Sequence, residues 1–185
     1  DRNMFAFLVN DEQRLEDGSE GGLGRGFCCW NSEVRQMSFG FQTFLYRYVC
    51  GNHIVWGAKE LNTLRMIHLG ADFRSRAEKE LRGMLDKYLG TSIGPEQKLV
   101  NAARLTQLAS KVDDVFTLLT SKRIHFGKAD AEAIVKGVQL VGEDPTNLWD
   151  LVNGATVYSQ TKHAHADERN EMDRRASRLL DMAKL

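Results

Sequence analysis

The sequence predicts an α+β fold, with an N-terminal, mostly antiparallel sheet of four or five strands followed by four to six helices. Residues 1–70 are rich in aromatic and β-branched residues separated by glycine and asparagine turns, which is typical of strands. From residue 72 onward, apolar residues recur at helical spacing. Strands grouped before helices favour α+β over a doubly wound sheet.

Composition places the chain among ordinary globular proteins. Its 185 residues, 42% of them hydrophobic and 27% charged, suit one domain. We expect a strand-rich region over residues 1–70 and a helical region over residues 71–185 that packs on it. No run of about 18 apolar residues exists, which excludes a membrane-spanning helix. The three cysteines, an odd number, predict a reducing, cytoplasmic location.

The predicted strands differ in how clearly the sequence indicates them. Residues 3–9 are apolar and predict a buried strand, and residues 27–34 predict the second. Between them, residues 10–26 are polar and hold the sequence GGLGRG, which we interpret as a long, mobile hairpin connection. Residues 39–50 fit a strand or a helix, and we favour a strand or a strand–helix junction. Residues 53–58 and 64–69 predict two further short strands.

The helical half begins at Asp72, a plausible N-cap, and Gly90 suits the position after the first helix. Pro95 fits the first residue of the next helix, whose pattern either continues or breaks near Ser110. Gly127 separates a fourth helical pattern, and Thr146 is expected to cap a fifth.

The last predicted helix carries the apolar stripe Met172, Ala176, Leu179 and Leu180 after a polar segment. This composition predicts a helix that packs weakly or against a partner.

Polar residues within the predicted sheet form the first candidate site. Buried charges must be paired, so a structural Arg–Glu network is one interpretation. The other is a phosphate or nucleic-acid site, because arginine binds phosphate through two parallel hydrogen bonds. The candidate binding residues are Arg47, Asn52, Arg65 and His68 of the sheet together with Arg74 and Arg76 at the start of the first long helix, with Glu33, Cys50 and His53 as further members of the polar cluster.

Three other patterns in the sequence give weaker evidence for a binding or catalytic site. GGLGRG lacks the Lys-Ser or Lys-Thr of a phosphate-binding loop. Cys50 and His53 are three residues apart, a spacing that matches no known catalytic signature, and a buried cysteine beside a turn histidine is the alternative. His163, His165 and Asp167 would face one metal ion on a strand but diverge on a helix. We therefore expect no metal and no cofactor.

Several motifs resemble the phage- and plasmid-associated "domain of unknown function 932" family. The family's central Arg-x-x-Cys-x-Asn is matched by Arg47, Cys50 and Asn52, and its later Arg-x-x-His by Arg65 and His68. The preceding Asn-Ser-Glu-Val is matched by Asn31, Ser32, Glu33 and Val34, and a C-terminal pattern by Trp149, Leu151, Asn153, Thr156 and Tyr158. Directly after Asn-Ser-Glu-Val the family has glycine or serine, whereas this chain has the residues RQM at positions 35–37.

The resemblance implies a mobile-element protein in a bacterial cytoplasm, or in the host cytoplasm of a phage, with a further N-terminal portion upstream. It supplies no activity. Residues 61–128 hold 12 Lys and Arg against 7 Asp and Glu, although the formal net charge is 0. We therefore predict a non-enzymatic accessory protein that binds single-stranded DNA or RNA in replication, recombination or host-defence interference.

Two alternatives stay open. The first is a module that binds a protein partner or assembles with itself. The second is an enzyme that depends on Cys50, His53 and His68.

Overall fold

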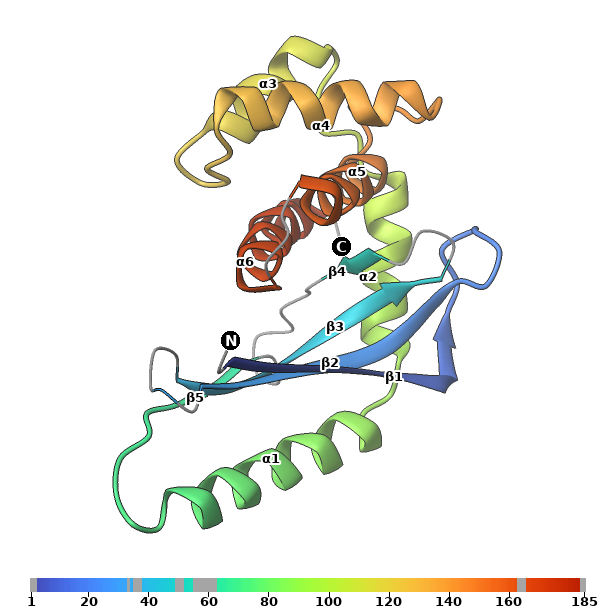
Figure 1. Ribbon diagram of the computed structural model, residues 1–185. Coiled ribbons are helices and arrows are strands. Elements are labelled where there is room, and N and C mark those ends of the chain that lie inside the picture. Colours follow the sequence, from blue (N-terminus) through green and yellow to red (C-terminus); the bar gives the residue numbers. More distant parts are fainter. Residues whose placement is uncertain are drawn as a thin grey trace.

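The computed structural model describes residues 3–32, 34, 38–48, 52–54, 63–162 and 166–183. It has one antiparallel sheet at the N-terminus, followed by helices on both faces of the sheet (Figure 1). The predicted α+β class is confirmed. The strands are β1 (Asn3–Leu15), β2 (Leu23–Ser32), β3 (Phe39–Arg47), β4 (Asn52–Ile54) and β5 (Thr63–Met66).

Strands β1, β2 and β3 form a meander in which each strand pairs antiparallel with the next. β1 continues through a bulge between Asn10 and Arg14 to Leu15. The expectation of a mobile connection over residues 10–26 is therefore wrong. Only residues 16–22 connect the strands, and Gly18, Gly21 and Gly22 have the positive φ angles that the turn requires.

The outer edge of β3 is shared by two short strands. β4 pairs with Leu45, Tyr46 and Arg47, whereas β5 pairs with residues 39–42. At the junction, the hydroxyl of Tyr88 donates to the carbonyl oxygen of Phe44 at 3.5 Å. Residues 39–47 are thus strand, as favoured from the sequence.

The helices are α1 (Phe73–Gly90), α2 (Gly94–Leu105), α3 (Val112–Thr120), α4 (Lys128–Leu140), α5 (Leu148–Lys162) and α6 (Ala166–Ser177), and the 3₁₀ helix η1 (Arg178–Met182) follows. Among the described residues, no helix is long and apolar enough to cross a membrane.

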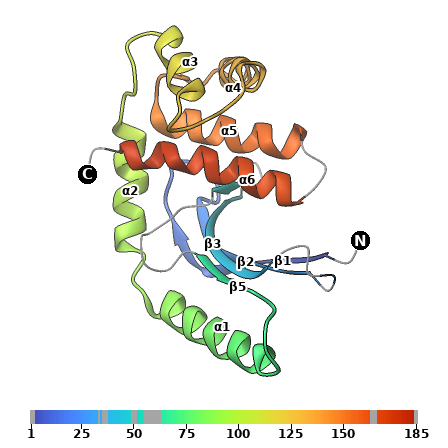
Figure 2. The ribbon, with the colours of Figure 1, turned by 90° about the vertical axis from the view of Figure 1, so that its left-hand side faces the viewer.

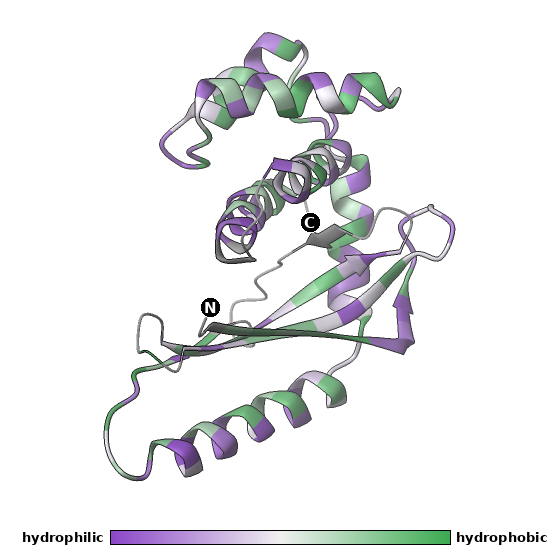
Figure 3. Ribbon diagram, in the orientation of Figure 1, coloured by the Kyte–Doolittle hydropathy of each residue, from purple (hydrophilic) through white to green (hydrophobic). Residues whose placement is uncertain are grey.

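Helix α1 lies below the sheet, and α5 and α6 lie above it (Figures 1 and 2). Apolar and polar residues alternate along α1 (Figure 3), as expected of a helix with one face on a sheet. Its Phe73 ring packs edge-to-face on Phe39 of β3, with the centroids 6.2 Å apart. Ala77 and Tyr88 are its buried residues.

The main hydrophobic core lies among the helices and at one end of the sheet. Leu15, Leu23 and Leu45 supply the strand side of this core. The helices supply most of the remainder, including Leu99, Val115, Ile134, Leu151 and Leu179.

Three expectations for the helical half need correction. The cap of α5 is Asn147, whose side-chain oxygen accepts from the backbone N–H of Trp149 and Asp150, and not Thr146. Gly90 is the last residue of α1 rather than the one after it. The stripe of the last helix, Met172, Ala176, Leu179 and Leu180, is fully part of the main core, so this segment does not pack weakly.

Buried ion pairs tie the sheet to its surroundings at the same end as the core. Arg25 of β2 lies 2.9 Å from Glu96 of α2, and its side chain is only 2% exposed. Its guanidinium also stacks on the ring of Tyr88, 4.0 Å from the ring centroid. Arg47 of β3 lies 2.8 Å from Asp17, whose side chain is fully buried.

Candidate nucleic-acid interface

Glycines on β2 and β3 allow aromatic rings to lie against the sheet. A Cβ atom at Gly40 would meet the Trp30 ring at 2.0 Å, and one at Gly26 would meet the Phe44 ring at 2.6 Å. Each glycine therefore provides the space that a neighbouring ring occupies. Gly24 and Gly26 belong to GGLGRG, so part of this motif is a buried strand that accommodates rings rather than a hairpin tip.

These rings form an aromatic face on the side of the sheet opposite α1. The aromatic face consists of Phe5, Phe7, Trp30, Phe44 and Tyr46, which alternate along β1, β2 and β3. Most of them form a small hydrophobic cluster that is separate from the main core. Phe7 packs edge-to-face on Phe44 at 6.1 Å and is 42% exposed. The β1 side of the aromatic face is therefore open to solvent.

Arg174 of α6 reaches this face from above. Its Nε and Nη2 atoms donate to the side-chain oxygen of Gln42, at 3.0 and 2.7 Å, and Gln42 is 1% exposed. The guanidinium carbon lies 5.6 Å from the Trp30 ring centroid, within the range of a cation–π contact. The buried amide and the ring thus fix the position of Arg174.

Arg65 of β5 is the second arginine at this place. It pairs with Gly40, the residue that Trp30 covers, and it is exposed. Burial lowers the pKa of Arg174, and the positive charge of Arg65 lowers it further, while Glu171 opposes the shift. Two like charges side by side are unfavourable, and a bound anion would relieve that repulsion.

Within the described residues, no carboxylate forms an ion pair with Arg174. Glu171, the carboxylate of α6 whose charge acts on Arg174, contacts Arg175 at 3.3 Å instead. A half-buried arginine normally has an anionic partner. Together, Arg65 and Arg174 can hold a phosphate group, and we call them the arginine pair.

Neither cysteine of the described residues has the lowered pKa of a reactive thiol. Burial raises the pKa of the Cys28 thiol to about 12, with a contribution from Cys29. Burial also raises the pKa of Cys29. Because the thiolate is the reactive form, both side chains stay protonated near neutral pH.

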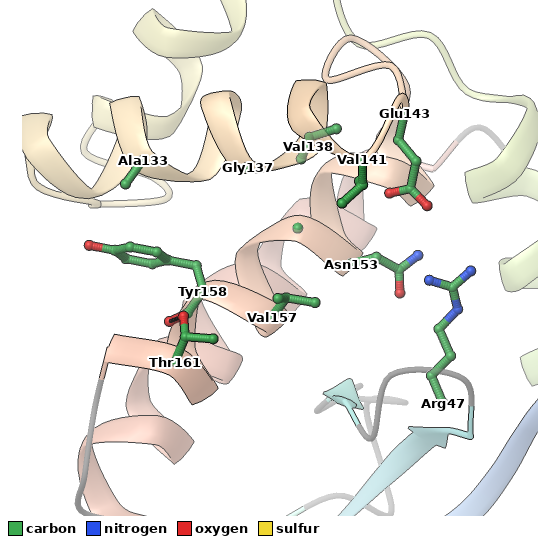
Figure 4. Close-up of a pocket in the computed structure, with 11 residues that line it drawn as sticks. Arg47, Ala133, Gly137, Val138, Val141, Glu143, Asn153, Val157, Tyr158 and Thr161 are labelled. Atoms are coloured by element: carbon green, nitrogen blue, oxygen red, sulfur yellow. Dashed lines mark hydrogen bonds between the residues drawn. The ribbon is translucent and has the colours of Figure 1, made fainter.

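The residues proposed from the sequence for one binding site are spread over the molecule. Arg47 is seven residues along β3 from the partner of Arg65, roughly 23 Å at the rise of a strand. It pairs with Asp17 and faces α5 (Figure 4). Of these residues, Arg65 alone is at the aromatic face among those whose side chains are described.

The other candidates on β5 and α1 have local partners or are exposed. The His68 ring stacks on Phe73 at 4.5 Å. Arg76 forms an exposed ion pair with Asp72 at 3.0 Å and donates to the carbonyl of Leu69. Asp72 is at the N-cap position of α1, as predicted, but its side chain makes no capping hydrogen bond. Arg74 is exposed on the first turn of α1.

Several candidates lie outside the described residues, namely Glu33, Cys50, His163 and His165. The backbones of Asn52, His53 and Asp167 are described, in β4 and α6, but their side chains are not. Within the described ranges, no group of three or more His, Cys, Asp and Glu side chains could hold a metal ion.

Sequence reasoning missed Trp30, Gln42 and Arg174. Arg174 lies in a polar segment with charges of both signs, so nothing marks it out from its neighbours. A signal existed in β2 and β3, where Gly26 and Gly40 interrupt otherwise aromatic strands, because glycine within a strand often marks a close approach.

Comparisons of the sequence and structure with protein-family models, with curated proteins and with solved structures find no match. The resemblance to the "domain of unknown function 932" family therefore stays a prediction.

Proposed function

We propose that the protein binds single-stranded nucleic acid along the aromatic face, as a non-enzymatic accessory protein of a phage or plasmid. The observation that carries the proposal is the arginine pair on an aromatic sheet face, with Arg174 held over Trp30 and lacking a carboxylate partner among the described residues. The mobile-element setting rests on the family resemblance alone.

The arginines and the aromatic rings would contact different parts of the nucleic acid. The arginine pair contacts phosphate groups, which gives affinity independent of base sequence. Phe7, the exposed ring of the aromatic face, and Tyr46, which is half-buried, stack against bases. A neutral protein can bind in this way, because only the local charge beside the strand matters at a Debye length of about 10 Å in 0.1 M salt.

The test is fluorescence anisotropy of labelled single-stranded and double-stranded DNA and RNA at two salt concentrations. We expect the single strands to bind more tightly, and binding to weaken as salt rises. Phe7→Ala should weaken binding about 5- to 100-fold, the effect of one lost stacking contact. Its matched control is Leu8→Ala, since Leu8 is equally exposed but points to the opposite face.

The arginine pair is tested in the same assay. Arg65→Gln should weaken binding and reduce its salt dependence, whereas Arg82→Gln should do neither, because Arg82 is exposed on α1 and pairs with Glu78. Absence of binding at tens of micromolar protein in low salt would overturn the proposal. Equal effects of Phe7→Ala and Leu8→Ala would also overturn it.

A second candidate function, self-assembly, is favoured by the edge of β1. Among the described strands β1 pairs with β2 alone, and Met4, Phe7 and Leu8 are 53%, 42% and 52% exposed. The first part of β1, residues 3–10, is uncharged and largely apolar, and such an edge is a template for strand addition. Light scattering over a range of concentrations tests this function. Self-assembly predicts a mass that rises with concentration and falls in Leu8→Lys.

A further inference from the structure

A cavity of about 430 Å³ lies between α4 and α5, and none of its lining residues belongs to the aromatic face (Figure 4). Its walls are apolar along Val138, Val141 and Val157. A Cβ atom at Gly154 would meet Val138 at 2.1 Å, so the two helices touch at this point and close one side of the cavity.

Polar groups gather at one end of the cavity. Asn153, Glu143 and Arg47 come from α5, from the turn after α4 and from β3, and Figure 4 shows them facing one another. Asn153 is 2% exposed and the Arg47 side chain is 14% exposed. A partly open apolar hollow with a few convergent polar groups, here with Val141 71% exposed at its rim, has the usual form of a small-molecule site.

Asp17 holds Arg47 in place and occupies only part of the hydrogen-bond donors of the Arg47 guanidinium group. The carboxylate of Asp17 accepts from the Nε atom of Arg47 at 2.8 Å, and the backbone N–H of Ser19 donates to Asp17 at 3.0 Å. No described side chain accepts a hydrogen bond from the terminal nitrogens of Arg47. These nitrogens are donors at the polar end of the cavity.

Charge at this end favours an uncharged ligand. Arg47 is paired through its Nε atom with Asp17, and Glu143 adds a carboxyl group. Burial raises the pKa of Glu143, as does the nearby Asp150, whereas Arg47 lowers it. An anionic ligand would meet Glu143, and a cation would meet Arg47. A neutral group with adjacent acceptor and donor atoms satisfies both.

We infer that this cavity binds a small, uncharged molecule with an apolar or aromatic body and an amide-like polar edge. The acceptor of that edge faces Arg47, its donor faces Glu143, and its body lies between Val141 and Val157. Carboxamides and nucleobases share this chemistry. The inference does not depend on nucleic-acid binding at the aromatic face.

Gly137 supplies a test that spares the fold. It lines the cavity, and a Cβ atom added there would meet nothing within 4 Å. Gly137→Leu should therefore fill the cavity while improving helix propensity. The matched control is Gly83→Leu on α1, where an added Cβ also meets nothing within 4 Å and which does not line this cavity.

The experiment measures binding of benzamide, benzoate and guanosine to the full chain by ligand-observed NMR, with calorimetry for the tightest probe. We expect benzamide or guanosine to bind more tightly than benzoate. Gly137→Leu should weaken the binding at least tenfold, and Gly83→Leu should leave it unchanged. Glu143→Gln should improve benzoate relative to benzamide, because it removes the repelling carboxylate.

Each opposite outcome overturns part of the inference. If no probe binds at millimolar concentration, the cavity is not a site for this ligand class. Undiminished binding in Gly137→Leu would place the ligand elsewhere, as would an equal loss in Gly83→Leu. Tighter binding of benzoate than of benzamide by the unmodified chain would overturn the preference for an uncharged ligand.

Discussion

The two ends of the sheet are built in different ways. At one end, Leu15, Leu23 and Leu45 enter the main core, and Arg25 has a buried carboxylate partner in Glu96. At the other end, Phe5 and Trp30 of the aromatic face belong to a small cluster that is separate from the main core. Its arginine, Arg174, interacts with an amide and a ring.

This difference indicates a division between stability and binding. A paired, buried charge contributes to the fold and leaves little for a ligand. An arginine that is held in place but has no carboxylate partner among the described residues is available for an anion. If this division is correct, variants at the closed end, at Leu45 and Arg25, mainly change stability. Variants at the open end, at Phe7 and Arg174, mainly change binding.

The largest expected effect is at the closed end. Glu96→Ala leaves Arg25, with a side chain 2% exposed, buried without its counter-charge, and should lower the free energy of unfolding by about 3–5 kcal/mol. The measurement is urea unfolding followed by circular dichroism. Glu78→Ala is the control, since its pair with Arg82 is exposed, and should change stability by less than about 1 kcal/mol. Similar losses in both variants would contradict this account.

Leu45→Ala should have the next largest effect. Leu45 is 2% exposed within the main core, and a buried leucine reduced to alanine costs about 2–5 kcal/mol. Leu8→Ala, at 52% exposure on β1, should change stability by no more than about 0.5 kcal/mol. The same unfolding assay compares them. A large loss in Leu8→Ala would mean that the open end contributes as much to the fold as the closed end.

Gly40→Ala disturbs the open end directly. The added methyl group would overlap the Trp30 ring, so the ring must move, at an expected cost of about 1–3 kcal/mol for an overpacked site. Arg174 loses its position with the ring, and nucleic-acid binding should fall with it. Gly83→Ala, on a helix with open space around it, should leave binding intact and stabilise slightly. Unchanged tryptophan fluorescence in Gly40→Ala would contradict the prediction.

A smaller effect depends on pH and concerns the attachment of α6. Burial raises the pKa of Asp173 from 3.8 to about 7, although Ser159 donates a hydrogen bond to it. The folded chain therefore binds more protons than the unfolded chain between those values, and stability falls as pH rises through this window. Asp173→Asn removes the titration.

The stability of Asp173→Asn relative to the unmodified chain should therefore increase as pH rises from about 4 to 8. Each pKa unit corresponds to about 1.4 kcal/mol, and water that enters beside the ionised group reduces the total to an expected 1–2 kcal/mol. Thermal unfolding at a series of pH values measures the difference. A stability difference that stays constant with pH would show that Asp173 has an ordinary pKa.

The order of strands and helices could be predicted from the sequence because apolar periodicity records which side of each element is buried. The same periodicity predicted the apolar stripe of α6. It did not predict how deeply this stripe is buried, because periodicity does not indicate how much of a helix face will be covered. Residues 10–26 were misinterpreted because glycine is a feature of turns and also of strands that rings approach closely.

The candidate site was harder to predict. Arg65 was found because an arginine in a sheet is unusual, but Arg47 and Arg76 were grouped with it although they have partners of their own. Arg174 is 132 positions from Gln42. Such a contact depends on how α6 crosses the sheet, and local sequence patterns carry no information on that crossing.

Two glycines of the sheet leave space for neighbouring aromatic rings, and this arrangement also has an evolutionary consequence. Because the Trp30 ring fills the space above Gly40, and the Phe44 ring the space above Gly26, a side chain at either glycine is unfavourable unless the neighbouring ring changes with it. Relatives of this chain should change them in pairs, with a smaller residue at position 30 whenever position 40 acquires a side chain. Substitution records of such relatives would thus reveal the aromatic face as two coupled columns.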